Sequence, residues 1–290
     1  MKKNIDTLVK DIQALFDPNY QHEFDPEHVQ DFGQRVANLV AQRMSEYRGK
    51  PSLRMSNLGK DDRRLWLDIN KPELGEPLTP QTYVKFLYGD ILEELLLFLS
   101  KEAGHEVTGE QGTLEINGVV GHRDAIIDGV LVDVKSASSY SFKNFKSGTL
   151  ADDDKFGYID QINQYLFASQ DDSLVKEKDV SAFFVIDKTN GSMCIDKHPK
   201  NDKDYSKVVD EKREMLKGPM PELCETPVPE GKSGNEKLGI KCSYCPFKKV
   251  CYPNLRTFLY SHGPVFLTTV KKLPRVYEVP NDGQDSRFED

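Results

Sequence analysis

The feature that most constrains the fold of this chain is the stretch of residues 121–136, which reads as two short apolar strands joined by a tight turn. The turn falls at the dipeptide Asp128-Gly129, a pair that favours two-residue hairpins in which both backbone φ angles are positive. The stretch therefore predicts a pair of antiparallel strands within the core of the protein.

Three charged side chains interrupt this apolar hairpin. Asp124 belongs to the first strand, and Asp133 and Lys135 belong to the second. Because side chains alternate along a strand, Asp133 and Lys135 are expected on one face and Val134 on the other. Two carboxylates and an ammonium are costly to bring together unless a cation uses them, and such a set is typical of metal-dependent phosphodiesterases. The alternative is an edge hairpin with surface acids and a lysine as their cross-strand partner.

Length and composition define the broad class of the protein. With 290 residues, 30% of them charged, the chain is long enough for a full core. No apolar run approaches the roughly 20 residues that span a bilayer, and the first residues lack the apolar centre of a signal peptide, so we expect a cytoplasmic protein with no membrane partner. The net charge of −8 argues only modestly against a nucleic-acid partner, because acidic site residues and an acidic chain end contribute to it.

The order of the predicted elements divides the chain into four parts. Two apolar helical stripes form an N-terminal helical arm over residues 1–50, and a core follows over residues 51–220. A cysteine-rich module occupies residues 221–260, and a charged tail occupies residues 261–290. The core is expected to contain a helix, strands, a polar loop, a second helix and a hairpin, at residues 81–103, 106–136, 137–149, 152–169 and 182–195. The fold class is therefore α/β, with a central mixed sheet flanked by helices.

A third acid comes from the long helix that precedes the hairpin. Glu93 and Glu94 interrupt an otherwise apolar part of this helix, so one of the two is expected to face inward. An inward carboxylate without a partner is costly, and this favours a functional use for it.

The order of these motifs resembles that of the PD-(D/E)XK nuclease superfamily, and specifically its RecB-like exonuclease branch. The resemblance covers roughly residues 53–255 and rests on four motifs in the family's order, namely Gly89 with Glu93, Gly121-His122-Arg123-Asp124, Asp133-Val134-Lys135, and Gln161 with Tyr165. Each motif is weak alone, but four in order are a specific signal. The resemblance implies a restriction-endonuclease-like core.

The resemblance also implies roles for individual residues. Glu93, Asp124 and Asp133 would bind Mg²⁺ or Mn²⁺ together with the carbonyl oxygen of Val134, and Lys135 would be catalytic.

The remaining motif and two departures from the family pattern concern the same site. Gln161 and Tyr165, four residues apart on one helical face, would orient the site or contact the DNA backbone. Glu93 stands where the RecB branch usually has histidine, and Asp133 stands where glutamate is commoner. Both departures keep a hard oxygen ligand, so the chemistry is retained.

A second group of candidate ligands lies near the C-terminus. Three of the five cysteines, Cys242, Cys245 and Cys251, have the spacing C-x₂-C-x₅-C, which lets thiolates converge on one iron–sulfur or zinc centre. The spacing resembles the C-terminal part of the iron–sulfur module of RecB-like nucleases, in which a fourth cysteine precedes the nuclease core. Lys60 or Asp61 stands at that position here.

The fourth ligand is therefore open. Cys224 is a candidate substitute, whereas Cys194 has the context of a buried strand residue. We consider three possibilities for the set Cys224, Cys242, Cys245 and Cys251: a [4Fe–4S] cluster, a zinc ion, or no metal at all. A centre at this place would be structural, because it would tie the C-terminal segment to the segment near residue 60.

Basic and aromatic residues alternate in and just after the polar loop that follows the second strand of the hairpin. They are Tyr140, Phe142, Lys143, Phe145, Lys146 and Lys155. Lysines bind phosphates and aromatic rings stack on unpaired bases, so the loop is a candidate single-strand clamp. The alternative is a solvated loop whose phenylalanines pack on the core.

These observations favour a metal-dependent DNA exonuclease that acts on single strands or duplex ends in recombination, repair or phage DNA metabolism. DNA is then the expected partner, with recombination or replication proteins as further candidates, and the host cytoplasm is the expected location if a phage encodes the chain. The alternatives are a structure-specific endonuclease or nickase with the same site, and a catalytically silent DNA-binding module.

Overall fold

The computed structural model describes residues 3–19, 21–45, 51–152 and 154–280, which form two compact units. The first contains the described residues of Met1–Gly59 and Thr79–Glu211, and the second contains those of Lys60–Leu78 and Lys212–Asp290. The predicted core boundaries at residues 51 and 220 are therefore corrected: the segment Lys60–Leu78 belongs with the C-terminal part of the chain. No helix in the described part of the chain is long and apolar enough to cross a membrane.

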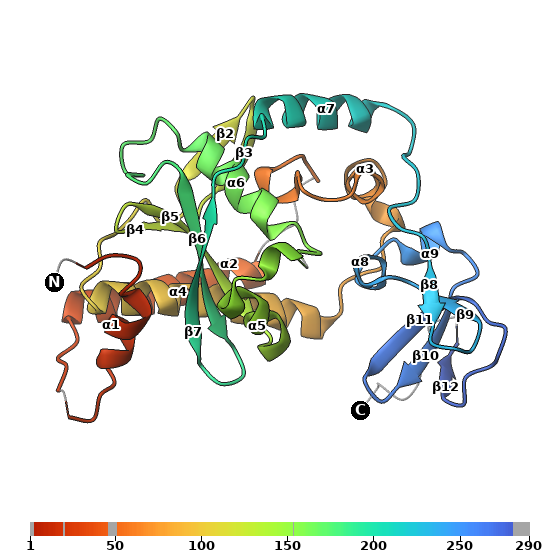
Figure 1. Ribbon diagram of the computed structural model, residues 1–290, viewed down its shortest axis with the longest axis horizontal. Coiled ribbons are helices and arrows are strands. Elements are labelled where there is room, and N and C mark those ends of the chain that lie inside the picture. The colour runs from red at the N-terminus through yellow and green to blue at the C-terminus, as the bar shows by residue number, and fades with distance from the viewer. Residues whose placement is uncertain (1–2, 20, 46–50, 153, 281–290) are drawn as a thin grey trace. The chain divides into compact units, whose positions relative to one another are not determined.

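A five-stranded mixed sheet forms the centre of the first unit, in the order β1-β4-β5-β6-β7 (Figure 1). Its β5 and β6 pair in parallel, and the other neighbours are antiparallel. The turn between β4 and β5 has φ angles of 53° at Asp128 and 83° at Gly129, as the hairpin prediction requires. The strands are β1 (Val107–Thr108), β4 (Ala125–Ile127), β5 (Val130–Ala137), β6 (Val180–Asp187) and β7 (Met193–Pro199).

Helices cover both faces of this sheet, so the predicted mixed α/β class is confirmed. Alternate residues of β6 point to opposite sides: Phe184 packs in a core with the first and fourth helices, and Phe183 packs in a core with the fifth and sixth. Strand alternation is the physical reason for this division. The helices are α1 (Leu8–Ala14), α2 (Pro26–Ser45), α4 (Pro80–Glu102), α5 (Ser139–Ser147), α6 (Tyr158–Ala168) and α7 (Tyr205–Lys217), the last of which begins in this unit.

The N-terminal helices are part of the first unit and not a separate arm. Leu8 and Ile12 of α1 are fully buried in the same core as α4 and β5. The α2 helix lies beside α4 (Figure 1), and the rings of Phe32 and Phe98 stack with their centroids 4.9 Å apart. Amphipathic stripes predict a helix but not its partner, and here the partner is the long helix of the core. Residues 46–50 of the predicted arm lie outside the described residues.

The predicted polar loop at residues 137–149 is corrected, because most of it forms α5. The Ser138 hydroxyl accepts a hydrogen bond from the backbone N–H of Ser141, and Gly148 ends the helix with a φ of 68°. Phe142 and Phe145, three residues apart, are buried in the core under the helix. The polar residues on the exposed face obscured this helical spacing in the sequence. The clamp interpretation therefore loses both phenylalanines, although Tyr140 is exposed.

The first unit also contains a two-stranded sheet and two short helical turns, one of which is η3 (Leu150–Asp152). The turn η1 (Met55–Asn57) packs against β3 and α6. The two strands are β2 (Thr113–Ile116) and β3 (Val119–His122), and they pair in an antiparallel hairpin.

The second unit is built on its own five-stranded sheet, with the strand order β12-β10-β11-β9-β8 and antiparallel pairing throughout. The predicted tail is thus wrong for residues 263–279, which supply two of the strands; residues 281–290 lie outside the described part. Charged residues suggested a tail, but Arg256 and Glu278 pair across neighbouring strands at 2.6 Å. The strands are β8 (Val228–Glu230), β9 (Asn235–Lys237), β10 (Arg256–Tyr260), β11 (Gly263–Thr269) and β12 (Tyr277–Val279).

The helix α3 (Asp62–Asn70) explains why the segment near residue 60 belongs to this unit. Its Leu67 is buried in a small core with Cys245 and Phe247, and Trp66 packs against this core. The indole N–H of Trp66 donates to the backbone carbonyl of Gly218 at 3.0 Å. The short helices α8 (Ile240–Ser243) and α9 (Lys248–Cys251) carry the cysteine motif.

Candidate functional site

The second strand of the hairpin places an acid and a lysine on one face. Asp133 is buried, and one of its carboxylate oxygens lies 2.5 Å from the Nζ atom of Lys135. Val134 points to the opposite face and packs in the core beneath α4. Burial alone would lower the pKa of Lys135, but the charges of Asp133 and Asp124 outweigh this effect and raise it. The alternation that the sequence predicted for this strand is confirmed.

Asp124 lies immediately before β4 and is fixed against the second strand. Its Oδ2 atom accepts a hydrogen bond from the backbone N–H of Val134 at 2.7 Å. Burial, followed by the charge of Asp133, raises the pKa of Asp124 to about 7, although Lys135 and the N–H of Val134 act in the opposite direction. The two aspartates are therefore close enough to repel one another.

Gly121, the glycine of the motif that contains Asp124, lies where no side chain fits. A Cβ atom there would lie 2.7 Å from the Cβ of Met55 and 2.9 Å from the Cε1 of Tyr165. Both neighbours are buried, so neither has room to move. The glycine thus lets the strand before Asp124 approach α6, which carries the last of the four predicted motifs.

The two adjacent glutamates of α4 have different surroundings. Glu93 faces the aspartates: burial, followed by the charges of Asp124 and Asp133, raises its pKa to about 9. Glu94 instead pairs with Arg35 of α2, with a distance of 2.6 Å between Oε2 and Nε. Glu93 is therefore the inward acid of the pair.

A cavity of about 510 Å³ opens in front of Glu93 and Asp124. Its opposite wall is the polar face of α2, which contributes Asn38, Gln42 and Arg43. Asp133 and Lys135 are not among its lining residues, but their charges shift the pKa values of Glu93 and Asp124, which do line it.

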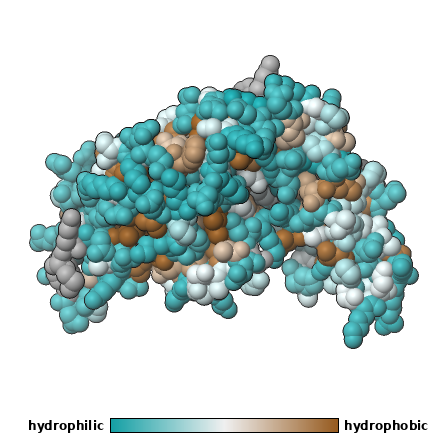
Figure 2. All heavy atoms as spheres, turned by 45° about the horizontal axis from the view of Figure 1, so that its top comes forward, coloured by the Kyte–Doolittle hydropathy of each residue, from teal (hydrophilic) through white to brown (hydrophobic). Residues whose placement is uncertain are grey.

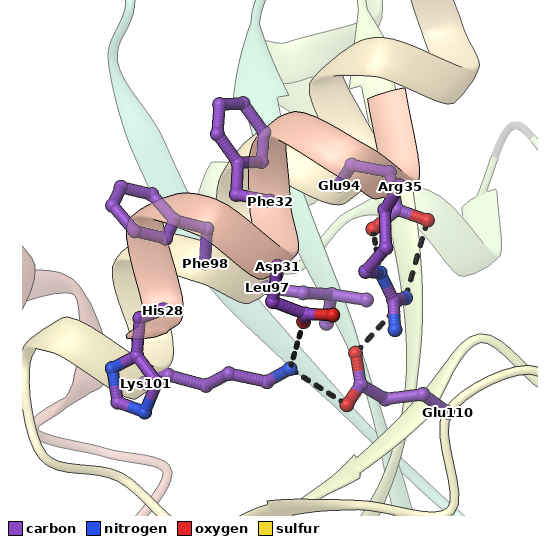
Figure 3. A pocket seen from close by; sticks show the side chains of 9 residues that line it. All are labelled: His28, Asp31, Phe32, Arg35, Glu94, Leu97, Phe98, Lys101 and Glu110. Atoms are coloured by element: carbon purple, nitrogen blue, oxygen red, sulfur yellow. Dashed lines mark hydrogen bonds and ion pairs between the residues drawn. The ribbon is translucent and has the colours of Figure 1, made fainter. Parts of the chain in front are cut away.

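Ion pairs fasten this wall to α4. Figure 3 shows the guanidinium of Arg35 between Glu94 and Glu110, and the ammonium of Lys101 between Asp31 and Glu110. The Nε of Arg43 lies 2.7 Å from the Oδ2 of Asp90 at the other end of the cavity. Ion pairs thus hold α2 against α4 at both ends of the cavity.

The α6 helix supplies the aromatic side of the site. The Nζ of Lys135 lies 5.5 Å from the ring centroid of Tyr158, within the range of a cation–π contact. Gln161 is hydrogen-bonded to Tyr165, whose pKa burial raises to about 12; the charges of Asp133, Asp124 and Lys135 also reach it. Tyr158 was not predicted from the sequence, although its spacing of three and seven residues from Gln161 and Tyr165 indicates the same helical face.

The charge arrangement fits a divalent cation. Carboxylates that crowd one another in a poorly hydrated place are stabilised when a cation binds between them, and carboxylate oxygens are the ligands that Mg²⁺ and Mn²⁺ prefer. Within the part of the chain that the structure describes, no three His, Cys, Asp or Glu side chains already form a complete set of metal ligands. The fit therefore rests on the electrostatics of Glu93, Asp124 and Asp133 and not on a preformed coordination shell.

Four of the five cysteines line a small cavity in the second unit. They are Cys224, Cys242, Cys245 and Cys251. Cys194, in contrast, is buried under α5 in the first unit, as its strand context predicted. All five cysteines are free thiols. The structure thus brings Cys224 to the other three, which no spacing rule in the sequence required.

The arrangement of these thiols suits a metal centre that binds soft sulfur ligands. Burial raises the pKa of Cys224, Cys242 and Cys245, and the charges of neighbouring cysteines act in the same direction. Arg63 donates from Nε to the Sγ of Cys251 at 3.3 Å. A bound iron–sulfur cluster or zinc ion would displace the protons of these crowded thiols and stabilise the thiolates that result.

No family model and no curated protein matches this chain. Among solved structures, one named "Crystal structure of SSO0001" covers 76% of this chain and 94% of its own, with 14% sequence identity and a TM-score of 0.42.

Proposed function

We propose that this protein is a metal-dependent deoxyribonuclease, and specifically an exonuclease that removes nucleotides from single strands or duplex ends. The observation that carries the proposal is the gathering of three carboxylates and one ammonium: Glu93 and Asp124 line one cavity, Lys135 is paired to Asp133 beside it, and burial together with neighbouring carboxylate charge raises the pKa values of Glu93 and Asp124. Clusters of perturbed carboxylates in a cavity are characteristic of functional sites.

Different residues would serve different parts of phosphodiester hydrolysis. Glu93, Asp124, Asp133 and the Val134 carbonyl would hold Mg²⁺ or Mn²⁺, which when bound polarises the scissile phosphate and activates a water molecule. Lys135 contributes positive charge that offsets the charge on the phosphate or orients the attacking water.

Residues beyond the metal ligands would hold the DNA. Tyr165 is buried within reach of the charges of Asp133 and Asp124, so it would orient the site, while its hydrogen-bonded partner Gln161, which is half-buried, would contact the DNA backbone as the family resemblance implies. The cavity volume of about 510 Å³ is in the range of small-ligand sites, so it suits a strand end or one or two nucleotides.

The proposal is tested with linear DNA labelled at one end and incubated with Mn²⁺ or Mg²⁺. We expect degradation that EDTA abolishes and that Asp124→Asn or Lys135→Met lowers at least about a hundredfold. The matched control is Glu106→Gln, which removes an exposed carboxylate of the same unit that pairs with Lys176, and it should keep full activity. Activity that survives both site substitutions would contradict the proposal.

A circular single strand separates the enzymatic alternatives. An exonuclease leaves it intact because it has no end, whereas an endonuclease with the same residues cuts it; a nickase is detected in the same assay by relaxation of a closed circular duplex. A protein that binds the linear DNA without cutting it under any of these conditions would be the catalytically silent module.

We also propose that Cys224, Cys242, Cys245 and Cys251 bind one structural centre, either a [4Fe–4S] cluster or Zn²⁺. The supporting observation is their position around a single cavity in a small core that also contains Leu67 and Phe247. A centre there would stabilise the contact between α3 and the cysteine motif.

Metal content tests this second proposal. Anaerobically purified protein is analysed for iron, sulfide and zinc, and its visible absorbance is recorded. Cys224→Ser should lose the centre, while Cys194→Ser should keep it because Cys194 lies in the other unit. Protein without iron or zinc, or equal metal content in both variants, would contradict the assignment.

A further inference from the structure

The loop of residues 109–112, between β1 and β2, wraps around the buried side chain of Arg123. The Nε of Arg123 donates to the carbonyl of Gly109 at 3.0 Å, and the backbone N–H of Arg123 donates to the carbonyl of Gly112 at 3.0 Å. A Cβ atom at either glycine would lie 2.7 Å from the guanidinium. Asp172 holds the other end of the guanidinium in an ion pair. The loop is thus shaped around a fixed charge.

A second anchor lies within the same loop. Glu110 forms ion pairs with Arg35 at 3.0 Å and with Lys101 at 2.8 Å (Figure 3). These two partners belong to α2 and α4, so the loop is tied to both helices that border the acid cavity. The residue between these anchors therefore has a restrained backbone.

That residue is Gln111, and it contacts two of the proposed metal ligands. Its backbone N–H donates to the carbonyl of Asp124 at 3.0 Å, and its Nε2 donates to the Oε1 of Glu93 at 2.7 Å. Its φ angle is 50°, in the left-handed region that glycine adopts most readily. Gln111 adopts this conformation although glycine would adopt it with less strain.

We propose that Gln111 is a positioning residue, whose side-chain amide holds the Glu93 carboxylate in the orientation that binds the divalent cation. The inference rests on the proposed function and adds to it a residue outside the four sequence motifs. Partners that hydrogen-bond to a ligating carboxylate fix its direction, and their loss costs about 10- to 100-fold in metal affinity. Strained backbone at such a place is tolerated because the surrounding contacts enforce it.

The backbone conformation makes a sharp experiment possible. Gln111→Gly removes the amide at a position where glycine is the least strained residue, so the variant is expected to fold at least as well as the unchanged chain. Gln111→Met keeps the side-chain length and the backbone restraint but removes the donor. Asn117→Gly is the matched control, because Asn117 also has a positive φ, of 46°, and its amide reaches the Ser206 carbonyl and not Glu93.

The measurement is Mn²⁺ binding to the full-length protein by isothermal titration calorimetry, with thermal unfolding recorded in parallel. We expect the Kd of Mn²⁺ to rise about tenfold or more in Gln111→Gly and Gln111→Met. The Kd should be unchanged in Asn117→Gly, and all three variants should be folded.

Two results would overturn the inference, and they differ in what else they affect. If the unchanged protein binds Mn²⁺ and Gln111→Gly binds it as tightly, the positioning role is wrong while the proposed function stands. If the unchanged protein binds no Mn²⁺ or Mg²⁺, the proposed metal site is wrong and the role of Gln111 falls with it.

Discussion

Lys135 illustrates how its neighbours restrain a single charged side chain of the proposed site. Its ammonium lies between the carboxylate of Asp133 and the ring of Tyr158, and its side chain is 24% exposed. An ammonium with two such contacts has few alternative positions, so its positive charge stays at one point in the site. The ring of Tyr158 is thus expected to contribute to catalysis through Lys135 and not by direct contact with the substrate.

Substitution of Tyr158 tests this expectation. Tyr158→Leu removes the aromatic face, and a cation–π contact of about 1 kcal/mol corresponds to a fall in kcat of about fivefold. Tyr158→Phe keeps the face and should keep kcat near its original value. Steady-state kinetics on linear DNA would check both variants, with KM as the second readout. An equal loss in the two variants would point to the hydroxyl group instead.

The close packing around Gly121 leads to a prediction about the stability of the protein. Gly121→Ala places a Cβ atom 2.7 Å from the Cβ of Met55, and overpacking of this kind costs about 1–3 kcal/mol of unfolding free energy. Gly33→Ala is the control, because a Cβ atom at Gly33, in the middle of α2, would have nothing within 4 Å of it and alanine favours the helix by about 0.5–1 kcal/mol. Urea denaturation should therefore shift in opposite directions for the two variants. A neutral Gly121→Ala would contradict the tight packing of β3 on α6.

At the scale of elements, the attachment of α2 to α4 decides the shape of the cavity. Glu102, buried near the end of α4, accepts hydrogen bonds at the start of α2 from the Asp25 backbone N–H and from the rings of His22 and His28, the last at 2.7 Å. Burial would raise the pKa of Glu102, but its contacts with the two histidines and with Asp25 outweigh this effect and lower it. The negative charge of a carboxylate near the first turn of a helix also interacts favourably with the helix dipole.

Glu102→Ala should loosen α2 without unfolding the sheet. The substitution removes the hydrogen bonds that join the start of α2 to the end of α4, which costs about 1–3 kcal/mol. Hydrogen exchange should therefore accelerate over Pro26–Ser45 and stay unchanged over β5 and β6. Because the folded pKa is lowered, this stabilisation is present above the unfolded pKa of about 4.3 and is lost as the pH falls through the folded value. Equal exchange rates in the variant and the unchanged protein would exclude this role.

At the scale of the whole molecule, the chain divides into two units with separate cores. The first carries the carboxylates and Lys135, and the second carries the four-cysteine cavity. On the face drawn in Figure 2, hydrophilic residues predominate and hydrophobic residues appear in separate small groups. Units with separate cores need not unfold together, so one melting temperature need not describe the protein.

Loss of the proposed cysteine centre should therefore affect one unit selectively. Cys224→Ser, or chelation of the metal, is expected to lower the melting temperature of the transition that belongs to the second unit, because metal binding contributes directly to folding free energy. Lys135→Met should leave that transition unchanged. Differential scanning calorimetry of the full chain would show both effects. A uniform shift of a single transition would mean that the two units unfold as one.

The sequence by itself determined the features that depend on neighbouring residues. The turn at Asp128-Gly129, the alternation that turns Val134 away from Lys135, and the helix that carries Glu93 all follow from backbone preferences and side-chain period. The spacing of Gln161 and Tyr165 likewise placed both on one helical face. Such features are local, so they can be read without knowing what packs against them.

Only the tertiary structure decided which distant segments meet. It joined α3 to the cysteine motif, brought Cys224 to three other thiols, made strands of residues in the predicted tail, and set Gln111 against Glu93 across 18 positions of sequence. The helix α5 was missed for a related reason. Phe142 and Phe145 are buried only because the sheet lies beneath them, and this contact cannot be inferred from the polar residues around them in the sequence. These outcomes follow from the packing of the whole chain, because a contact between distant residues is selected by its complete surroundings and not by the local preference of either partner.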